Sequence, residues 1–138
     1  MSDAALVEAT SGADRILIVD DGLYSYDSAN GADTLVTITN LEAIAEFNAR
    51  LRFRPTLDPG RCSCSGYPRL EWYRGKERVA FASVQHGKRL RWKGFGYDVP
   101  FASETVRWWK QFAQENRIPD GKVEPWEPIP PDSEGLVD

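Results

Sequence analysis

The segment RLEWYRGKERVAFASVQHGKRLRWKGF, residues 69–95, decides the fold because apolar and polar side chains alternate along three runs. Glycine-containing turn sequences, Gly75-Lys76 and His86-Gly87-Lys88, separate these runs. Alternation with a period of two is typical of a half-buried strand, and glycine permits the backbone of a tight turn. The segment therefore predicts a three-stranded antiparallel meander over residues 69–75, 78–85 and 89–95.

The alternation also predicts two chemically different faces for this sheet. Leu70, Trp72, Leu90 and Trp92 fall on one side, because successive side chains of a strand point to opposite faces. Basic residues fall on the other side, namely Arg89, Arg91 and Lys93. We expect the apolar side to face the core and the basic side to face solvent.

Elements outside the meander complete an α+β fold. RILIVD (15–20), GLYSYD (22–27) and TLVTITN (34–40) have the composition of strands. Thr39 followed by Glu42 matches a capping box, and Leu41, Ile44, Phe47 and Leu51 then recur at helical spacing. Ser103 is the expected N-cap of a second helix, whose apolar side holds Val106, Trp108, Trp109 and Phe112.

The predicted architecture is an antiparallel sheet that includes the meander and is packed by two helices. Its length of 138 residues suits one domain. We expect a flexible leader over residues 1–14, the α+β domain over residues 15–118, and an extended tail over residues 119–138. The tail holds five of the nine prolines and six acidic residues, a composition that disfavours a packed core.

Composition and charge narrow the class of protein. The N-terminus lacks the basic and apolar regions of a signal peptide, and no apolar run is long enough to span a membrane. With two cysteines as well, the sequence predicts a soluble cytoplasmic protein with reduced thiols. Net charge is −4, yet residues 50–93 carry twelve basic and three acidic residues. This asymmetry indicates an acidic partner, nucleic acid, or neutralisation by the chain's own acidic segments.

The two cysteines and the single histidine, Cys62, Cys64 and His86, are the candidate metal or thiol site. Thiolate and imidazole are zinc ligands, but structural zinc sites usually space their cysteines by two to four residues. A Cys62–Cys64 disulfide would close a very small and strained ring, which favours redox lability. The favoured interpretation is two packed thiols and a turn histidine, with no cofactor; zinc and redox chemistry are the alternatives.

The basic strip and nearby aromatic residues are the candidate binding surface. Arginine offers paired hydrogen bonds to carboxylates, and buried tryptophan or tyrosine anchors interfaces. The same combination could bind phosphates and stack on bases, although the sequence contains no recognised nucleic-acid motif. The candidate binding residues are Arg74, Arg89, Arg91, Lys93, Tyr73, Trp108 and Trp109.

Residues 62–118 resemble an uncharacterised bacterial domain with the pattern Cys-x-Cys-x-Gly, His-Gly-x-x-Leu-Arg-Trp and a following amphipathic helix. The matching positions are Cys62, Cys64, Gly66, His86, Gly87, Leu90, Arg91 and Trp92. The resemblance implies no catalytic role, because no activity is assigned to that domain. It implies that the cysteines and His86 approach one another.

The favoured functional hypothesis is a non-catalytic binding module for a protein with an acidic surface, comparable to immunity or adaptor proteins. The sequence lacks a P-loop, GxGxxG and HExxH, and a single turn histidine gives no clear catalytic set. The alternatives are a zinc or thiol-redox site at Cys62, Cys64 and His86, and nucleic-acid binding by the basic face. No membrane partner is expected.

Overall fold

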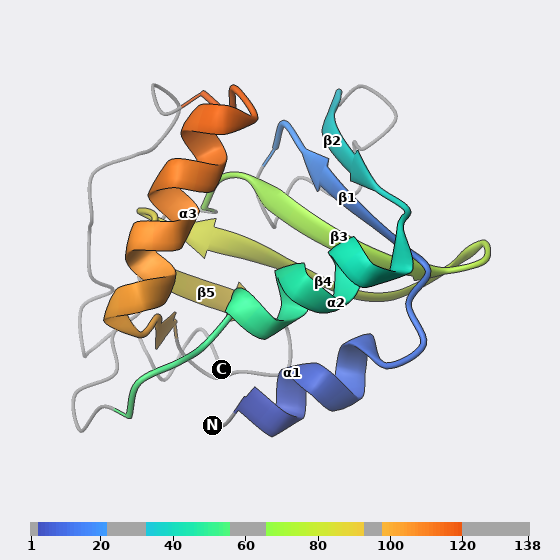
Figure 1. Ribbon diagram of the computed structural model, residues 1–138, viewed down its shortest axis with the longest axis horizontal. Helices are drawn as coiled ribbons and strands as arrows, with labels where there is room; N and C mark the ends of the chain where they lie inside the picture. Colours follow the sequence, from blue (N-terminus) through green and yellow to red (C-terminus); the bar gives the residue numbers. More distant parts are fainter. Residues whose placement is uncertain (1–2, 22–32, 56–65, 93–97, 120–138) are drawn as a thin grey trace, which may run out of the picture.

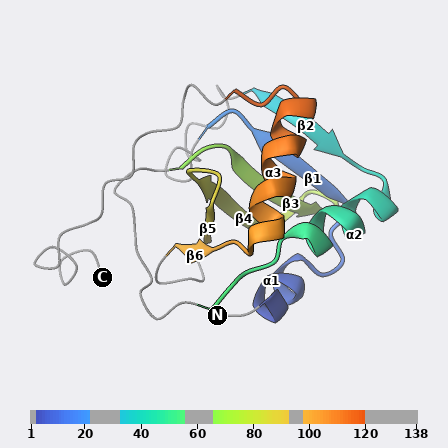
Figure 2. The same ribbon diagram turned by 60° about the vertical axis from the view of Figure 1, so that its left-hand side comes forward.

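The computed structural model describes residues 3–21, 33–55, 66–92 and 98–119, and the architecture below refers to these residues. The elements follow one another as α1 (Asp3–Thr10), β1 (Arg15–Val19), β2 (Thr34–Ile38), α2 (Leu41–Arg50), β3 (Arg69–Arg74), β4 (Glu77–Gln85), β5 (Arg89–Trp92), β6 (Val99–Pro100) and α3 (Ser103–Glu115). All strand pairs are antiparallel, in the order β2-β1-β3-β4-β5-β6. Helices α2 and α3 lie on the same face of this sheet (Figures 1 and 2). The predicted α+β class is confirmed.

The predicted meander is formed by β3, β4 and β5. Both turns have the left-handed backbone that their sequences suggest: φ is 60° at Gly75, 56° at His86 and 70° at Gly87. Two successive residues with positive φ are typical of the type I′ turn, which suits the twist of a hairpin. The amide of Lys88 closes this turn by donating to the carbonyl of Gln85 at 3.0 Å.

The core lies between the sheet and the two helices. Trp72 and Leu90 are fully buried, as predicted, together with Phe47 of α2 and Trp109 of α3. The indole of Trp72 donates to Asn48 Oδ1 at 2.8 Å, so its polar atom is also satisfied. Burial of such rings is a main stabilising contribution, at roughly 25 cal/mol per Å² of apolar area.

Both predicted helix caps were wrong by one residue. Asn40, rather than Thr39, caps α2, and its side chain accepts hydrogen bonds from the amides of Glu42 and Ala43. Asparagine serves as well as threonine at an N-cap, so a pattern search cannot separate adjacent candidates. Helix α3 begins at Ser103, and Ala102 at its N-cap makes no side-chain cap.

Helix α1 differs from the flexible leader predicted over residues 1–14. Leu6 is 2% exposed and belongs to the core, and the Thr10 hydroxyl donates to the Leu6 carbonyl. In both views α1 lies next to α2 at the margin of the sheet (Figures 1 and 2). One buried leucine in a short helix gives little periodicity, which explains why the sequence did not indicate it.

Some sequence predictions lie outside the described residues: the strand at 22–27, both cysteines, Lys93 and nearly all of the tail. Within the described part of the chain, no helix has the length and apolar character needed to cross a membrane.

Candidate binding site

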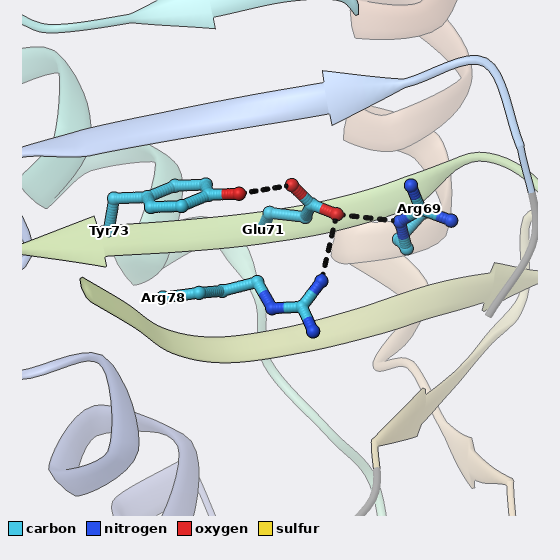
Figure 3. A network of polar contacts seen from close by, with 4 residues as sticks. All are labelled: Arg69, Glu71, Tyr73 and Arg78. Carbon is cyan, nitrogen blue, oxygen red and sulfur yellow. Dashed lines mark hydrogen bonds and ion pairs between the residues drawn. The ribbon is translucent and has the colours of Figure 1, made fainter. Parts of the chain in front are cut away.

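Four side chains on the face of the sheet that points away from α2 and α3 form a polar network around Glu71. Glu71 Oε2 accepts from Arg69 Nε at 2.7 Å and from Arg78 at 3.3 Å, while Oε1 accepts from the Tyr73 hydroxyl at 2.8 Å (Figure 3). Arg69 and Glu71 are 0% and 4% exposed. Burial first, and then the hydrogen bond to Glu71, raises the pKa of Tyr73. This carboxylate is therefore held by one phenol and two guanidinium groups.

The predicted solvent-facing basic strip is wrong at its central residue. Arg91 is 4% exposed, and its Nε and Nη2 donate to the two carboxylate oxygens of Asp98 at 2.6 and 2.9 Å. Asp98 is fully buried. A buried guanidinium is tolerated when a carboxylate accepts from it in this paired geometry. Arg91 is thus an internal ion-pair partner and not an exposed contact for another molecule.

The other predicted binding residues are scattered over the molecule. Arg89 is half-buried and donates to the Asp98 carbonyl at 3.2 Å. Arg74 is exposed and paired with Glu77 at 3.0 Å. Tyr73 packs against the guanidinium of Arg15, whose central carbon lies 4.6 Å from the ring centroid. These residues do not form one exposed surface.

The backbone of Gly66 lies close to side chains of this polar face. A side-chain carbon at Gly66 would lie 2.2 Å from Gln85 Nε2 and 2.6 Å from Ser83 Oγ. Both partners are fully buried, and Gln85 donates to Ser83 Oγ at 2.7 Å. With a φ of +78°, this position requires glycine for space and for backbone conformation. The glycine of the Cys-x-Cys-x-Gly pattern therefore has a packing role.

A pocket of about 450 Å³ lies between α3 and the turn that joins β4 to β5, and we call it the α3–hairpin pocket. Three of its lining side chains, Tyr67, Trp109 and Ile118, are at most 8% exposed and give it an apolar wall. Lys88 and Lys110 also line the pocket and are exposed. Neither lysine forms an ion pair or side-chain hydrogen bond in the part of the chain that the structure describes.

His86 lines the same pocket, at the first central position of the type I′ turn. Its φ of 56° is uncommon for a residue with a side chain, although histidine is among those that adopt it more readily. Cys62 and Cys64 lie outside the described residues, so their distance from His86 stays a prediction. Among the described residues, no group of three or more histidine, cysteine or acidic side chains could hold a metal ion.

The two adjacent tryptophans of α3 line two different hollows of the surface. Trp109 is 5% exposed and lines the α3–hairpin pocket. Trp108 is half-buried, and its ring centroid lies 5.3 Å from that of Phe47 and 5.2 Å from that of Phe112. It lines a separate groove beside β2. Of the predicted binding residues that the structure describes, only Trp109 lines the α3–hairpin pocket.

Tyr67 connects the pocket wall to the end of β1. Its hydroxyl donates to Asp20 Oδ1, and burial together with this bond raises the pKa of the phenol well above its usual range. The hydroxyl therefore stays protonated and acts as a donor at neutral pH. It fixes a wall of the pocket and offers no general base.

Comparison with protein-family models, curated proteins and solved structures found no match to this chain. The sequence did not indicate the α3–hairpin pocket, because Lys88 and Lys110 are 22 positions apart and belong to different elements. The signal that could have found it is Lys110 beside Trp109 on the helix that follows the meander.

Proposed function

We propose that this protein is a non-catalytic binding module for a protein with an acidic surface, and that the α3–hairpin pocket receives the partner. The observation that carries the proposal is the pair of exposed lysines, Lys88 and Lys110, at a pocket whose wall includes Trp109. An apolar pocket can take a hydrophobic anchor residue, while neighbouring cations attract carboxylates beside that anchor.

The size and chemistry of the pocket support this choice of partner. A volume of about 450 Å³ is within the usual range of ligand pockets, roughly 300–1,000 Å³, and can hold one large side chain. Among the described residues, the two lysines at this pocket have no carboxylate partner, in contrast to Arg74, Arg78 and Arg91. This difference supports a role for the two lysines in attracting an acidic partner.

The experiment measures binding of a synthetic peptide in which two glutamates flank a phenylalanine on each side, using isothermal titration calorimetry on the full chain. We expect Lys88→Glu/Lys110→Glu to weaken binding about tenfold or more, because attraction becomes repulsion. The matched control is Lys76→Glu, an exposed lysine in the turn at the opposite end of β4. We expect this control to change the dissociation constant less than about twofold.

Three outcomes would contradict the proposal. One is equal weakening by the control and the pocket variant, which would mean that only net charge matters. Another is equal affinity for a peptide in which lysines replace the glutamates. The third is tighter binding of single-stranded DNA, with an affinity that falls steeply with salt, which would favour the nucleic-acid alternative.

A further inference from the structure

The end of α3 turns the chain back against the α3–hairpin pocket. Arg117 has a φ of 56°. Its amide donates to the carbonyl of Gln114 at 3.3 Å, and the Ile118 amide donates to the carbonyl of Ala113 at 2.9 Å. These two bonds around a left-handed residue form a Schellman motif. Ile118 and Pro119 then line the pocket, so the residues that follow begin at its edge.

Packing, rather than a glycine, holds the chain in this direction. The left-handed position of a Schellman motif is usually glycine, because other residues find that backbone unfavourable. Arg117 occupies it here, and the next residue, Ile118, is 8% exposed and belongs to the core cluster. Burial of Ile118 offsets the unfavourable backbone of Arg117, and the chain is thereby kept directed at the pocket.

The sequence beyond Pro119 has the chemistry that the pocket is proposed to recognise. Residues 120–138, called here the acidic segment, lie outside the described residues and contain six acidic residues and one lysine. Trp126 is the one aromatic residue of this segment, and Glu124 and Glu127 stand on either side of it. An aromatic ring between carboxylates suits an apolar wall beside lysines.

The length of the connection allows Trp126 to enter the pocket. Trp126 follows Pro119 by seven positions, and an extended chain of that length spans about 23 Å. Such a short tether gives a local concentration of roughly millimolar order. Pro125 and Pro128 lie close to the tryptophan, and proline fixes φ, so less conformational entropy is lost when the segment binds.

Charge distinguishes this pocket from the groove beside β2, which is the other hollow along α3. That groove has a volume of about 570 Å³ and also has apolar surface, including Trp108. Among the described residues that line it, the charged one is Glu46, whereas Lys88 and Lys110 line the α3–hairpin pocket. An acidic segment gains attraction from the two lysines and gains none at Glu46.

We propose that the α3–hairpin pocket binds the acidic segment of the same chain, with Trp126 against its apolar wall. The two neighbouring glutamates then lie beside the two lysines of the pocket. An external acidic partner competes with this segment, so the segment regulates binding at the pocket. The regulatory step rests on the proposed function, whereas the contact within the chain does not.

The adjacent tryptophans of α3 report on the two hollows in one nuclear magnetic resonance experiment on the full chain. We expect Trp126→Ala to shift the indole N–H resonance of Trp109, because a ring leaves the pocket beside it. The resonance of Trp108, in the groove beside β2, should stay in place. The matched control is Leu136→Ala, which removes another apolar side chain of the acidic segment and should shift neither resonance.

An exchange of charges tests the contact with the lysines. Lys88→Glu/Lys110→Glu should move the indole resonance of Trp126 to its position in an unfolded chain, because attraction becomes repulsion. Adding Glu124→Lys/Glu127→Lys should return that resonance to its wild-type position, since opposite charges again face one another.

Calorimetry with the peptide of glutamates around phenylalanine tests the regulatory step. We expect Trp126→Ala to bind this peptide about tenfold more tightly than the wild type, because the pocket is then free of its internal competitor. Leu136→Ala should bind it as the wild type does.

Three results would overturn the contact within the chain. They are an unchanged Trp109 resonance in Trp126→Ala, a shift of Trp108 in its place, and a shift that depends on protein concentration, which would assign the segment to a second copy. Equal peptide affinity of the wild type and Trp126→Ala would overturn the regulatory step. A peptide that binds neither protein would contradict the proposed function and the regulatory step with it, while the Trp109 shift would still support the internal contact.

Discussion

Strands β3, β4 and β5 bury side chains on both of their faces, but with opposite chemistry. The face toward α2 and α3 holds apolar groups, whereas the reverse face holds cations, carboxylates and neutral polar groups. The apolar set is Leu70, Trp72, Ala82, Val84 and Leu90, and the polar set is Arg69, Glu71, Ser83, Gln85 and Arg91. All of them are at most 4% exposed.

The difference between the faces lies in how far each residue depends on its neighbours. An apolar side chain gains from any close packing, because dispersion and the hydrophobic effect have little directionality. A buried ion gains only from a partner in good geometry, and removal of that partner leaves a costly charge. On the apolar face, we therefore expect two substitutions to lower the free energy of unfolding more than either one alone. On the polar face, we expect replacement of both ion-pair partners by apolar residues to restore the stability that a single substitution removes.

The largest expected effect concerns the ion pair between Arg91 and Asp98. Asp98→Ala should lower the free energy of unfolding by about 3–5 kcal/mol, because it removes the carboxylate from a buried guanidinium. Arg91→Met/Asp98→Leu should recover most of that loss, since both charges are then absent. Urea denaturation of the single and double variants measures both effects.

The matched control for this comparison of single and double variants is Leu90, which precedes Arg91 in β5 and lies on the apolar face. Leu90 is fully buried and opposes Val99 across β5 and β6. Leu90→Ala should cost about 2–5 kcal/mol, and Leu90→Ala/Val99→Ala should cost more than either single change. A double variant of the ion pair that is as unstable as Asp98→Ala would show that the two faces do not differ in the proposed way.

A pair of glycines in the β3–β4 region gives the next largest effect. Gly66→Ala should lower stability by about 2–4 kcal/mol, from overpacking against Gln85 and Ser83 and from the left-handed backbone. Gly75→Ala should cost only about 1 kcal/mol, because its φ of +60° is similar but no atom lies within 4 Å of the added carbon. Thermal unfolding monitored by circular dichroism compares them, and equal losses would mean that contact with the polar face is unimportant at Gly66.

Sequence patterns predicted the elements of this fold better than the burial of its polar face. The alternation over residues 69–95 placed Trp72 and Leu90 in the core and set the turns at Gly75 and at His86-Gly87, as the structure confirms. The same alternation is normally read as one buried and one solvated face. It therefore gave no sign that Arg91 would be buried against Asp98.

The candidate site was harder to predict, because it depends on how separate elements pack. Lys88 belongs to a turn and Lys110 to a helix, and only tertiary structure places both at one pocket. Clustering of charge along the chain could not separate its three interpretations for the same reason, and the pairing of Arg74, Arg78 and Arg91 with acidic residues of the protein itself agrees with internal neutralisation at these positions. Local sequence carries turn and strand preferences, whereas the partner of a charge is set by the fold.

The smallest expected effect is that of Tyr73 on the polar face, and it depends on pH. At neutral pH, Tyr73→Phe should cost about 1 kcal/mol, through loss of the hydrogen bond to Glu71. The folded chain raises the pKa of this phenol above its ordinary value of 10.0. Above pH 10 the unfolded chain therefore releases the phenol proton before the folded chain does, and the stability from this residue falls as pH rises.

Denaturation of the wild type and Tyr73→Phe between pH 7 and pH 11 tests whether the stabilising contribution of Tyr73 falls as pH rises. The difference in unfolding free energy should be constant up to about pH 9 and should shrink above pH 10, because only the wild type carries this phenol. Other tyrosines and lysines also titrate in this range, but they are common to both proteins and cancel in the difference. A difference that stays constant to pH 11 would mean that Glu71 and burial do not hold the proton on Tyr73, and the polar face would then be more open to water than its contacts indicate.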